Sequence, residues 1–435
     1  MNTQELIIRF KSNSLFKDSF WAVGGNGLGN ALMLLSGILI ARMLGKDLYG
    51  EYGMVKTTMF LMALFATFGL GDTSTKFIAE YLQKDKLQIR SIITASLKIV
   101  LFFSLTMCAV LLVFATNIAK FVNEPQLAQP FRFLGIIIVF RALGTVGAGI
   151  LGGFKDYKRL GINNVVSGTV MLALCVPLTY LYNIEGALWA LLISQIGLSV
   201  LNIWSVNSRK RRYIQSSNTR FEKEIISFSF PFALNEFVYT ITSWGGSLLL
   251  AKYASLGELG MYTACTQWNA IILFMPSLLG NVILSYLSTT AVEDKKRHDT
   301  LIRRMLLINL ICTAIPLIIV AVFSNTIARY YGSTFKGMSS ILCVTILGTV
   351  FTCLTRVFQS NLMSEGRKWM AFSIRSFYNT LGLILTYVVL KFTNGINAAM
   401  NMSILSVLVN VLMLTLYYLT YRKLRKGEDR INHNS

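Results

Sequence analysis

The stretch ARMLGKDLYGEY, residues 41–52, resembles a second stretch of this chain, AKYASLGELGMY, residues 251–262. The two copies are 210 positions apart and align without a gap, so that Gly50 matches Gly260 and Tyr52 matches Tyr262. The register continues upstream, because FWAVGGNGLGNALMLLSGILIARML (20–44) aligns with FPFALNEFVYTITSWGGSLLLAKYA (230–254). A match that extends through a whole apolar segment at one offset predicts an internal repeat of about half the chain.

The chain is strongly apolar, with 54% hydrophobic residues and a mean hydropathy of +0.56. Apolar runs of about 20 residues recur from end to end, and each is long enough to cross a hydrocarbon core as a helix. The composition therefore predicts an all-α polytopic membrane protein. We place twelve spans at residues 20–42, 50–72, 91–115, 128–151, 161–182, 184–206, 225–250, 260–288, 304–324, 338–362, 370–393 and 396–421.

The basic residues follow alternate loops. Of the 41 Lys and Arg residues, 28 lie in the two terminal segments and in every second loop, whereas the opposite loops hold Arg42, Lys46, Lys120, Lys252, Arg329, Lys336 and Lys391. Because Lys and Arg are retained on the cytoplasmic side, we predict that both termini are cytoplasmic. The net charge of +21 then follows from topology, and we expect no nucleic-acid partner.

The repeat sets the expected domain organisation. Six spans separate the two copies, an even number, so both halves enter the membrane in the same direction. Parallel halves of this kind form transporters whose substrate site lies between them near the midplane. We predict an N-terminal six-helix half at 1–206, a basic cytoplasmic linker at 207–224, a C-terminal half at 225–421 and a basic cytoplasmic tail at 422–435.

Six basic residues lie inside the predicted spans: Lys56, Lys98, Arg132, Arg141, Arg356 and Arg375. A charge at the bilayer centre costs about 3 kcal/mol on insertion scales, so such residues should face water or protein. Arg141 is close to the middle of its span and either lines a cavity or binds helix carbonyls. The same two interpretations are open for Lys56, Lys98 and Arg356.

Arg132 and Arg375 lie near span ends, where a long basic side chain can reach the interface. Arg132 and Arg141 are nine residues apart and therefore lie on opposite faces of one helix. Among the acids only Glu236 is comparably deep, and it aligns with Asn26 in the repeat. It is either a coupling-ion site or the partner of a buried cation.

The sign of these charges favours an anionic substrate. Arg and Lys hold phosphate oxygens by charge-assisted hydrogen bonds, so Arg141, Lys56, Lys98 and Arg356 are the candidate phosphate-binding residues. Amides suit sugar hydroxyls, which adds Asn26, Asn235 and Gln267 to the substrate-binding candidates. A wider polar and aromatic group, most of which would simply pack helices, contains Asn30, Tyr239, Trp268 and Asn269.

Metal and cofactor chemistry have few residues to use. The six cysteines all lie in apolar runs without paired or metal-type spacing, and the two histidines, His298 and His433, lie in basic polar segments. We therefore expect no metal site, no cofactor, no catalytic residues and no enzymatic activity.

The stretch IARMLGKDLYGEYG (40–53), the six-plus-six spans and the basic interior resemble the O-antigen (Wzx-type) polysaccharide flippases of the multidrug/oligosaccharidyl-lipid/polysaccharide (MOP) exporter superfamily. The resemblance covers essentially the whole chain, although its motif is a short turn signature and no catalytic fingerprint. It implies two six-helix halves around a central cavity in the cytoplasmic (inner) membrane. It also implies an undecaprenyl-diphosphate-linked oligosaccharide as substrate, with membrane lipids and other polysaccharide-assembly membrane proteins as candidate partners.

Two other functions fit less well. A multidrug cation antiporter of the same fold needs intramembrane acids, which are nearly absent here. A membrane-embedded glycosyltransferase needs acidic catalytic residues, and the outer segments offer little beyond Asp47, Glu124, Glu185 and Glu258.

Overall fold

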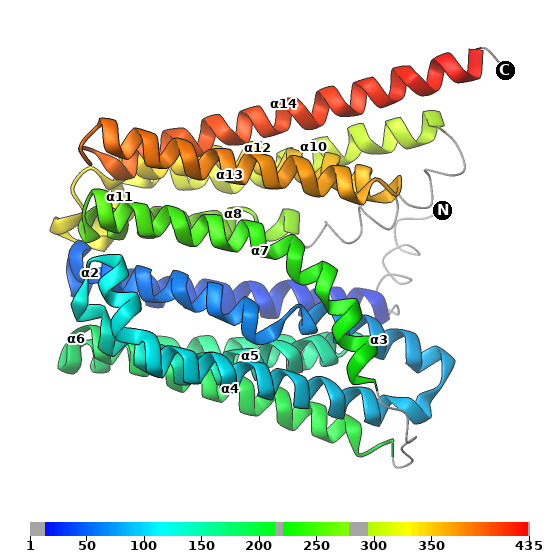
Figure 1. Ribbon diagram of the computed structural model, residues 1–435, viewed down its shortest axis with the longest axis horizontal. Helices are drawn as coiled ribbons and strands as arrows, with labels where there is room; N and C mark the ends of the chain where they lie inside the picture. The colour runs from blue at the N-terminus through cyan, green and yellow to red at the C-terminus, as the bar shows by residue number, and fades with distance from the viewer. Residues whose placement is uncertain (1–13, 214–220, 278–294, 434–435) are drawn as a thin grey trace, which may run out of the picture. The chain divides into compact units, whose positions relative to one another are not determined.

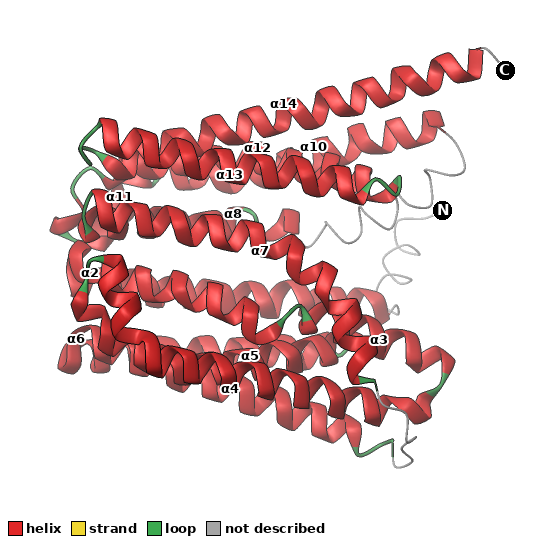
Figure 2. Ribbon diagram, in the orientation of Figure 1, coloured by secondary structure: helices red, strands yellow, loops and turns green. Residues whose placement is uncertain are grey.

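The computed structural model describes residues 14–213, 221–277 and 295–433. Figure 2 shows that the regular structure in these ranges is helical throughout, with no strand. Seven helices in the same ranges are long and apolar enough to cross a membrane. The prediction of an all-α polytopic membrane protein is therefore confirmed.

Two of these helices each hold a pair of predicted spans. The backbone of α2 (Ser14–Thr67) leaves the helical region at Gly45, where φ is 73°, a value that favours glycine. The backbone of α6 (Tyr157–Lys210) does so at Asn183, where φ is 49°. Both breaks fall between the expected spans, so each long helix is two spans joined by a very short turn.

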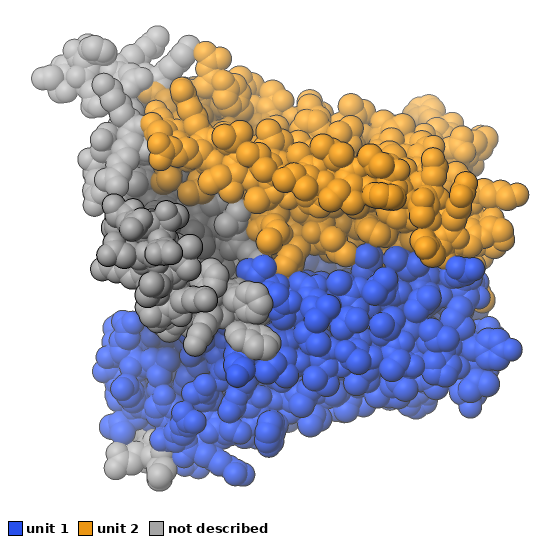
Figure 3. Space-filling model, turned by 180° about the vertical axis from the view of Figure 1, so that it is seen from behind, with its two compact units in different colours: residues 1–44, 51–244 blue, residues 45–50, 245–435 orange. Residues whose placement is uncertain are grey.

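The chain forms two compact units, coloured separately in Figure 3. Unit 1 comprises residues 1–44 and 51–244, and unit 2 comprises residues 45–50 and 245–435. Unit 1 contains most of α2, α3 (Leu70–Lys84), η1 (Lys86–Gln88), α4 (Ile89–Val122), η2 (Pro125–Leu127), α5 (Ala128–Gly153), α6 and the first part of α7 (Glu222–Tyr253). Unit 2 contains η3 (Ser333–Phe335) and six helices that are labelled in Figure 1: α8 (Leu256–Ile272), α10 (Lys295–Val322), α11 (Ser324–Tyr331), α12 (Met338–Ser364), α13 (Lys368–Phe392) and α14 (Ala398–His433).

The compact units do not coincide with the predicted sequence halves, whose linker lies at 207–224. Residues 222–244 of α7 belong to unit 1, where Trp244 Nε1 donates to Thr58 Oγ1 at 3.0 Å and Ser229 Oγ donates to Thr73 Oγ1 at 2.9 Å. Residues 45–50 belong to unit 2. Each sequence half thus gives one segment to the other unit.

The backbone repeats with the offset found in the sequence. Adding 210 to the bounds of α5 gives 338–363, and α12 runs Met338–Ser364. The break at Gly45 corresponds to Ser255, which precedes α8, and the break at Asn183 corresponds to Thr393, which follows α13. The residues with positive φ beyond α4 and α5, Asn123 and Lys155, have counterparts in Gly332 and Gly366 within one position. The internal repeat is therefore structural as well as sequential.

The second span differs from its predicted bounds of 50–72. Its helix ends at Thr67, because Phe68 and Gly69 have positive φ values of 47° and 71°. A separate amphipathic helix, α3, then carries Lys76 and Lys84, which we had expected in a loop. Its buried face includes Phe77 and Ile78, which explains why these residues are ordered in a helix. The end of the eighth predicted span and the counterpart of α3 lie partly or wholly outside the described residues.

Unit 1 is held together by close helix contacts at glycine. Gly25 of α2 packs on Gly161 of α6, and Gly149 of α5 packs on Gly71 of α3, each so tightly that an added methyl group would overlap backbone atoms. Small residues at helix contacts let backbones approach, which is how membrane helices associate where burial from water contributes little.

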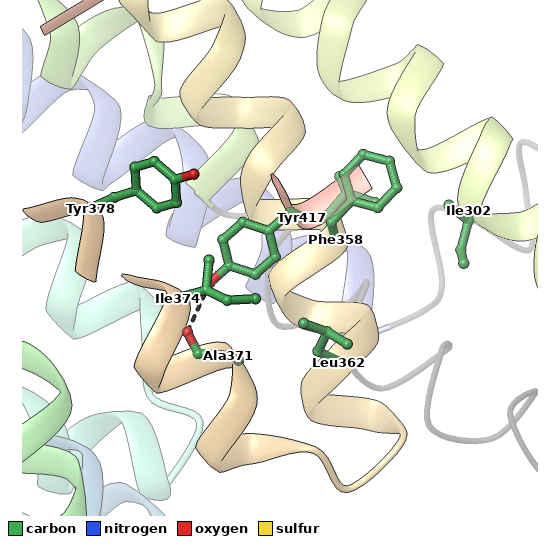
Figure 4. Packing of buried hydrophobic residues seen from close by; sticks show 8 residues of the cluster. Ile302, Phe358, Leu362, Ala371, Ile374, Tyr378 and Tyr417 are labelled. Carbon is green, nitrogen blue, oxygen red and sulfur yellow. Dashed lines mark hydrogen bonds between the residues drawn. The ribbon is translucent and has the colours of Figure 1, made fainter. Parts of the chain in front are cut away.

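Unit 2 contains an apolar cluster, shown in Figure 4. It joins α10, α12, α13 and α14 through buried side chains that include Ile302, Phe358, Ile374 and Tyr417. The Tyr417 hydroxyl lies inside this cluster and donates to the carbonyl oxygen of Ala371 at 2.9 Å. A buried hydroxyl is tolerated because it is hydrogen-bonded.

Candidate functional site

Two of the predicted cations, Arg141 and Lys56, lie together in unit 1. Arg141 of α5 stands over the ring of Phe60, with its guanidinium carbon 4.8 Å from the ring centroid. Lys56, one turn before Phe60 on α2, is close enough to Arg141 for the two charges to repel each other. Both side chains are half-buried, whereas Phe60 is 45% exposed. A guanidinium over an aromatic face is stabilised by the ring's negative face, so Phe60 holds Arg141 beside a like charge.

Two acids lie near each other in the same unit. Asp72, in the first turn of α3, and Glu236 of α7 are both exposed and close enough for their carboxylates to interact. The α3 segment also packs on α5 one turn beyond Arg141. A methyl group added at Gly71 would lie 3.5 Å from Thr145 Cγ2, and Thr145 Oγ1 donates to the Arg141 carbonyl oxygen at 2.9 Å.

We call Lys56, Arg141, Asp72 and Glu236 the charged track of unit 1. Two cations and two acids come from four different helices, α2, α5, α3 and α7. Sequence reasoning found three of the four but treated Glu236 as the lone deep acid. It missed Asp72 because that residue closed a predicted span, and it missed Phe60 because an apolar residue in a span gives no sign of an arginine above it.

The remaining predicted cations lie elsewhere. Lys98 of α4 is exposed and near Lys210, at the end of α6. Arg132 donates from Nη2 to Thr116 Oγ1 of α4 at 3.2 Å, so it faces a different helix from Arg141, as the nine-residue spacing predicts. Arg356 is exposed on α12 in unit 2, and Arg375 lies on α13 near Tyr417.

The three amide candidates have different surroundings. Asn26 lies at the contact of α2 with α6, where its Oδ1 accepts a short hydrogen bond from Asn164 Nδ2. The side chain of Asn235 is outside the described part of the structure. Gln267 of α8 uses both ends of its amide within unit 2, because it accepts from the Tyr49 hydroxyl at 3.3 Å and donates to the Tyr331 hydroxyl.

Gln267 belongs to a buried hydrogen-bond network around residues 45–50, the turn that joins the two spans of α2. Tyr331 is fully buried and also accepts from Trp268 Nε1 at 3.1 Å. The rings of Tyr49 and Tyr331 both contact Phe335, with centroids 6.2 Å and 5.4 Å away. These bonds fix residues 45–50 inside unit 2.

The two copies of the repeated phrase pack on each other in that unit. A methyl group added at Gly50 would overlap the carbonyl oxygen of Leu256, and one added at Gly260 would overlap the carbonyl oxygen of Lys46. The two contacts are the same contact made twice, because both the glycines and the carbonyls are related by the offset of 210. Each copy of the repeated segment therefore packs against the other.

The fold is shared with solved membrane transporters. The chain superposes on an inward-facing multidrug resistance transporter of the MATE family in the MOP superfamily with a TM-score of 0.79 and 16% identity, over 92% of this chain and 96% of that one. It also superposes on the lipid II flippase MurJ in an inward closed conformation, with a TM-score of 0.73 and 15% identity, over 93% of this chain and 87% of that one. The chain is therefore a polytopic membrane protein with the MOP superfamily fold.

Sequence comparison places the chain within that class. Residues 15–289 match the family described as polysaccharide biosynthesis protein, so the chain belongs to this family. It is 20% identical to a putative O-antigen transporter of Shigella flexneri, over 93% of this chain and 98% of that protein. It is 23% identical to the stage V sporulation protein B of Bacillus subtilis, where the match covers 68% of this chain and 63% of the relative.

Proposed function

We propose that this protein is a flippase for a lipid-linked oligosaccharide and that it works by alternating access. The substrate is an oligosaccharide on undecaprenyl diphosphate, such as an O-antigen repeat unit, carried from the inner to the outer leaflet of the cytoplasmic membrane. Both termini lie in the cytoplasm, and the partners are membrane lipids and other polysaccharide-assembly proteins. Support comes from the family, from the relative whose name is putative O-antigen transporter, and from the fold shared with a lipid II flippase.

The observation that carries the proposal is the pair of cations in unit 1. Lys56 and Arg141 repel each other, so an anion that binds both relieves this repulsion and gains charge-assisted hydrogen bonds. A diphosphate linkage is such an anion. The exposed ring of Phe60 offers an apolar face to a sugar ring beside it. Lys98, Arg356, Asn26, Asn235 and Gln267 stay in the proposal as further contacts along the path, of which Asn26 and Gln267 would first have to give up the hydrogen bonds that they make here.

We assign the acids of the charged track to ion coupling. Two carboxylates that are close enough to repel each other hold a proton or a Na⁺ ion more readily than one carboxylate does, because the bound cation relieves their repulsion. Glu236 and Asp72 lie on different helices, α7 and α3, so a movement between these helices would change the affinity for the ion. That is the requirement for coupling an ion gradient to transport.

Deletion of the gene tests the proposed function. Cells that lack the protein should lose their surface polysaccharide and accumulate the lipid-linked precursor on the cytoplasmic side, and the intact gene should restore the surface polymer. Unchanged surface polysaccharide in the deletion strain would exclude the proposal.

A multidrug cation antiporter is the second candidate, and the Asp72–Glu236 pair favours it, because an exported cation needs acids in its path. The two candidates give opposite results in one measurement. An antiporter deletion should raise sensitivity to cationic dyes without altering surface polysaccharide, whereas a flippase deletion should do the reverse.

A further inference from the structure

Unit 2 contains a cavity of about 360 Å³, which lies at the end of the unit where its basic segments are found. Its walls come from the start of α10, the end of α12 and the last turns of α14. This volume is within the range of small-ligand sites in proteins. The cavity lies apart in sequence from every residue of the charged track, and the transport proposal does not use it.

The rim of the cavity is basic. Arg303 of α10 and Arg422 and Arg425 of α14 line it together with a single acid, Asp299. Asp299 is already engaged, because it pairs with Arg425 Nη2 at 2.6 Å and accepts from the Tyr421 hydroxyl at 2.8 Å. Arg303 and Arg422 are exposed and have no ion-pair partner among the residues that the structure describes. The rim therefore keeps a net positive charge from Arg303 and Arg422, which both line the cavity.

One of the three arginines is fixed in place. The side chain of Arg425 is only 15% exposed, and its guanidinium carbon lies 5.5 Å from the centroid of the Tyr421 ring. The ion pair with Asp299 and the ring of Tyr421 together set the position of this guanidinium before any ligand arrives. Preorganisation of this kind lowers the entropy lost on binding.

The floor of the cavity is apolar. Ile302 and Phe358 line it, and they are 1% and 5% exposed. Both belong to the apolar cluster of unit 2 that Figure 4 shows. The ring of Phe358 also lies 5.6 Å from that of Tyr421, so the floor and the rim are in contact. A ligand for this cavity thus has an anionic part at the arginines and an apolar part toward the cluster.

We propose that this cavity binds the phosphate group of an anionic membrane phospholipid. Guanidinium groups bind phosphate oxygens in a bidentate manner, and basic pockets between membrane helices on the cytoplasmic side bind anionic lipid headgroups. The phosphate contacts Arg303, Arg422 and Arg425, and the glycerol backbone and the first methylene groups lie over Phe358 and Ile302. Such a lipid would join α14 to α10 at the membrane surface.

Binding of short-chain lipids to the purified, delipidated full-length protein tests the site. Dioctanoyl phosphatidylglycerol should bind in a saturable manner, followed by native mass spectrometry and by thermal stabilisation, and dioctanoyl phosphatidylcholine should bind much more weakly. The double variant Arg303→Gln, Arg422→Gln should lower the affinity for phosphatidylglycerol about thirtyfold, the factor expected for two interfacial charges. Both arginines are exposed, so the variant should fold.

The matched control is the double variant Arg304→Gln, Lys423→Gln. It removes the same charge from adjacent positions on the same two helices, yet neither residue lines the cavity. Its affinity should equal that of the parent protein. An equal loss in both double variants, or no saturable binding, would overturn the proposal.

Two further probes separate the possible sources of the phosphate. Inorganic phosphate at millimolar concentration should not displace the lipid if the apolar floor contributes, and efficient displacement would count against a lipid site. Undecaprenyl diphosphate is the second probe. If undecaprenyl diphosphate displaces phosphatidylglycerol with higher affinity, and the Arg303/Arg422 variant loses this effect, the occupant is a polyprenyl diphosphate and the proposal of a phospholipid is overturned.

Discussion

Arg141 and Lys56 hold like charges close together on two membrane helices, and Arg141 stands over the ring of Phe60. Such an arrangement is stable when the cations face water or an anion, because both settings lower their mutual repulsion. We therefore propose that Arg141 is a residue of the transport path and not a structural bond to helix carbonyls.

Replacement of Arg141 by Ala should lower transport about 10- to 100-fold, the effect of losing one hydrogen bond to a charged group. Lys should restore part of the activity because it keeps the charge but loses the bidentate geometry. Surface polysaccharide in a deletion strain, normalised to the amount of protein in the membrane, measures this. Arg132→Ala is the control, since Arg132 lies on the same helix and binds Thr116, and it should leave transport unchanged. Full activity of Arg141→Ala would remove Arg141 from the path.

A residue-level contact of this kind is hard to predict from a sequence. The depth of Arg141 could be read from its place in an apolar run, and so could that of Lys56. The ring of Phe60 and the approach of Asp72 to Glu236 depend on how four helices pack, and apolar residues in a membrane span carry little periodicity from which packing could be inferred.

At the scale of helices, the short breaks decide the fold. Gly45 and Asn183 each divide one continuous helix into two spans, and both breaks fall in the gaps that the predicted span bounds leave, 43–49 and 183. The amphipathic helix α3 was missed, because its polar face resembled a basic loop and only three of its buried residues are apolar: Leu70, Phe77 and Ile78. The repeat was visible in the sequence, but the direct contact between its two copies was not.

The contact between the two copies makes a prediction for glycine. Gly50→Ala and Gly260→Ala should each destabilise the protein by about 1–3 kcal/mol, because the methyl group meets a backbone oxygen and the helices must separate. The thermal midpoint of the purified protein in detergent reports this. Gly197→Ala in α6 is the matched control, since no described atom outside its own stretch of helix lies within 4 Å of the added methyl group, and it should be neutral or slightly stabilising. Wild-type stability of Gly50→Ala would contradict the contact.

At the scale of the whole molecule, the orientation in the membrane can be tested. Single cysteines replace Ile396, which is 67% exposed in the turn before α14, and Leu87, which is 48% exposed in η1, in a background without native thiols. An impermeant thiol reagent should label position 396 in intact cells and position 87 only after permeabilisation, because η1 lies among the basic segments. The opposite labelling would reverse the direction of transport.

The source of free energy for the proposed transport cycle can also be tested. A diphosphate carries about two negative charges, and each is driven outward by about 2.3 kcal/mol per 100 mV when the cytoplasm is negative. If Asp72 and Glu236 also couple an ion, Glu236→Gln and Asp72→Asn should both make transport insensitive to the ion gradient while its response to voltage persists. Headgroup translocation in proteoliposomes, with voltage and pH or Na⁺ gradients imposed separately, measures this. If transport by the parent protein does not change with any imposed ion gradient, ion coupling at Asp72 and Glu236 is excluded.

The contact between residues 46–50 and residues 256–260 also limits which substitutions this chain can accept. The contact is isologous, since position 50 meets position 256 just as position 260 meets position 46. In each case the atom that the glycine faces is a carbonyl oxygen of the main chain, which no substitution removes. A larger residue at Gly50 therefore has no compensating side-chain change at Leu256, and the same holds for Gly260 and Lys46. Most side chains differ between the two halves, but positions 50 and 260 must both remain glycine.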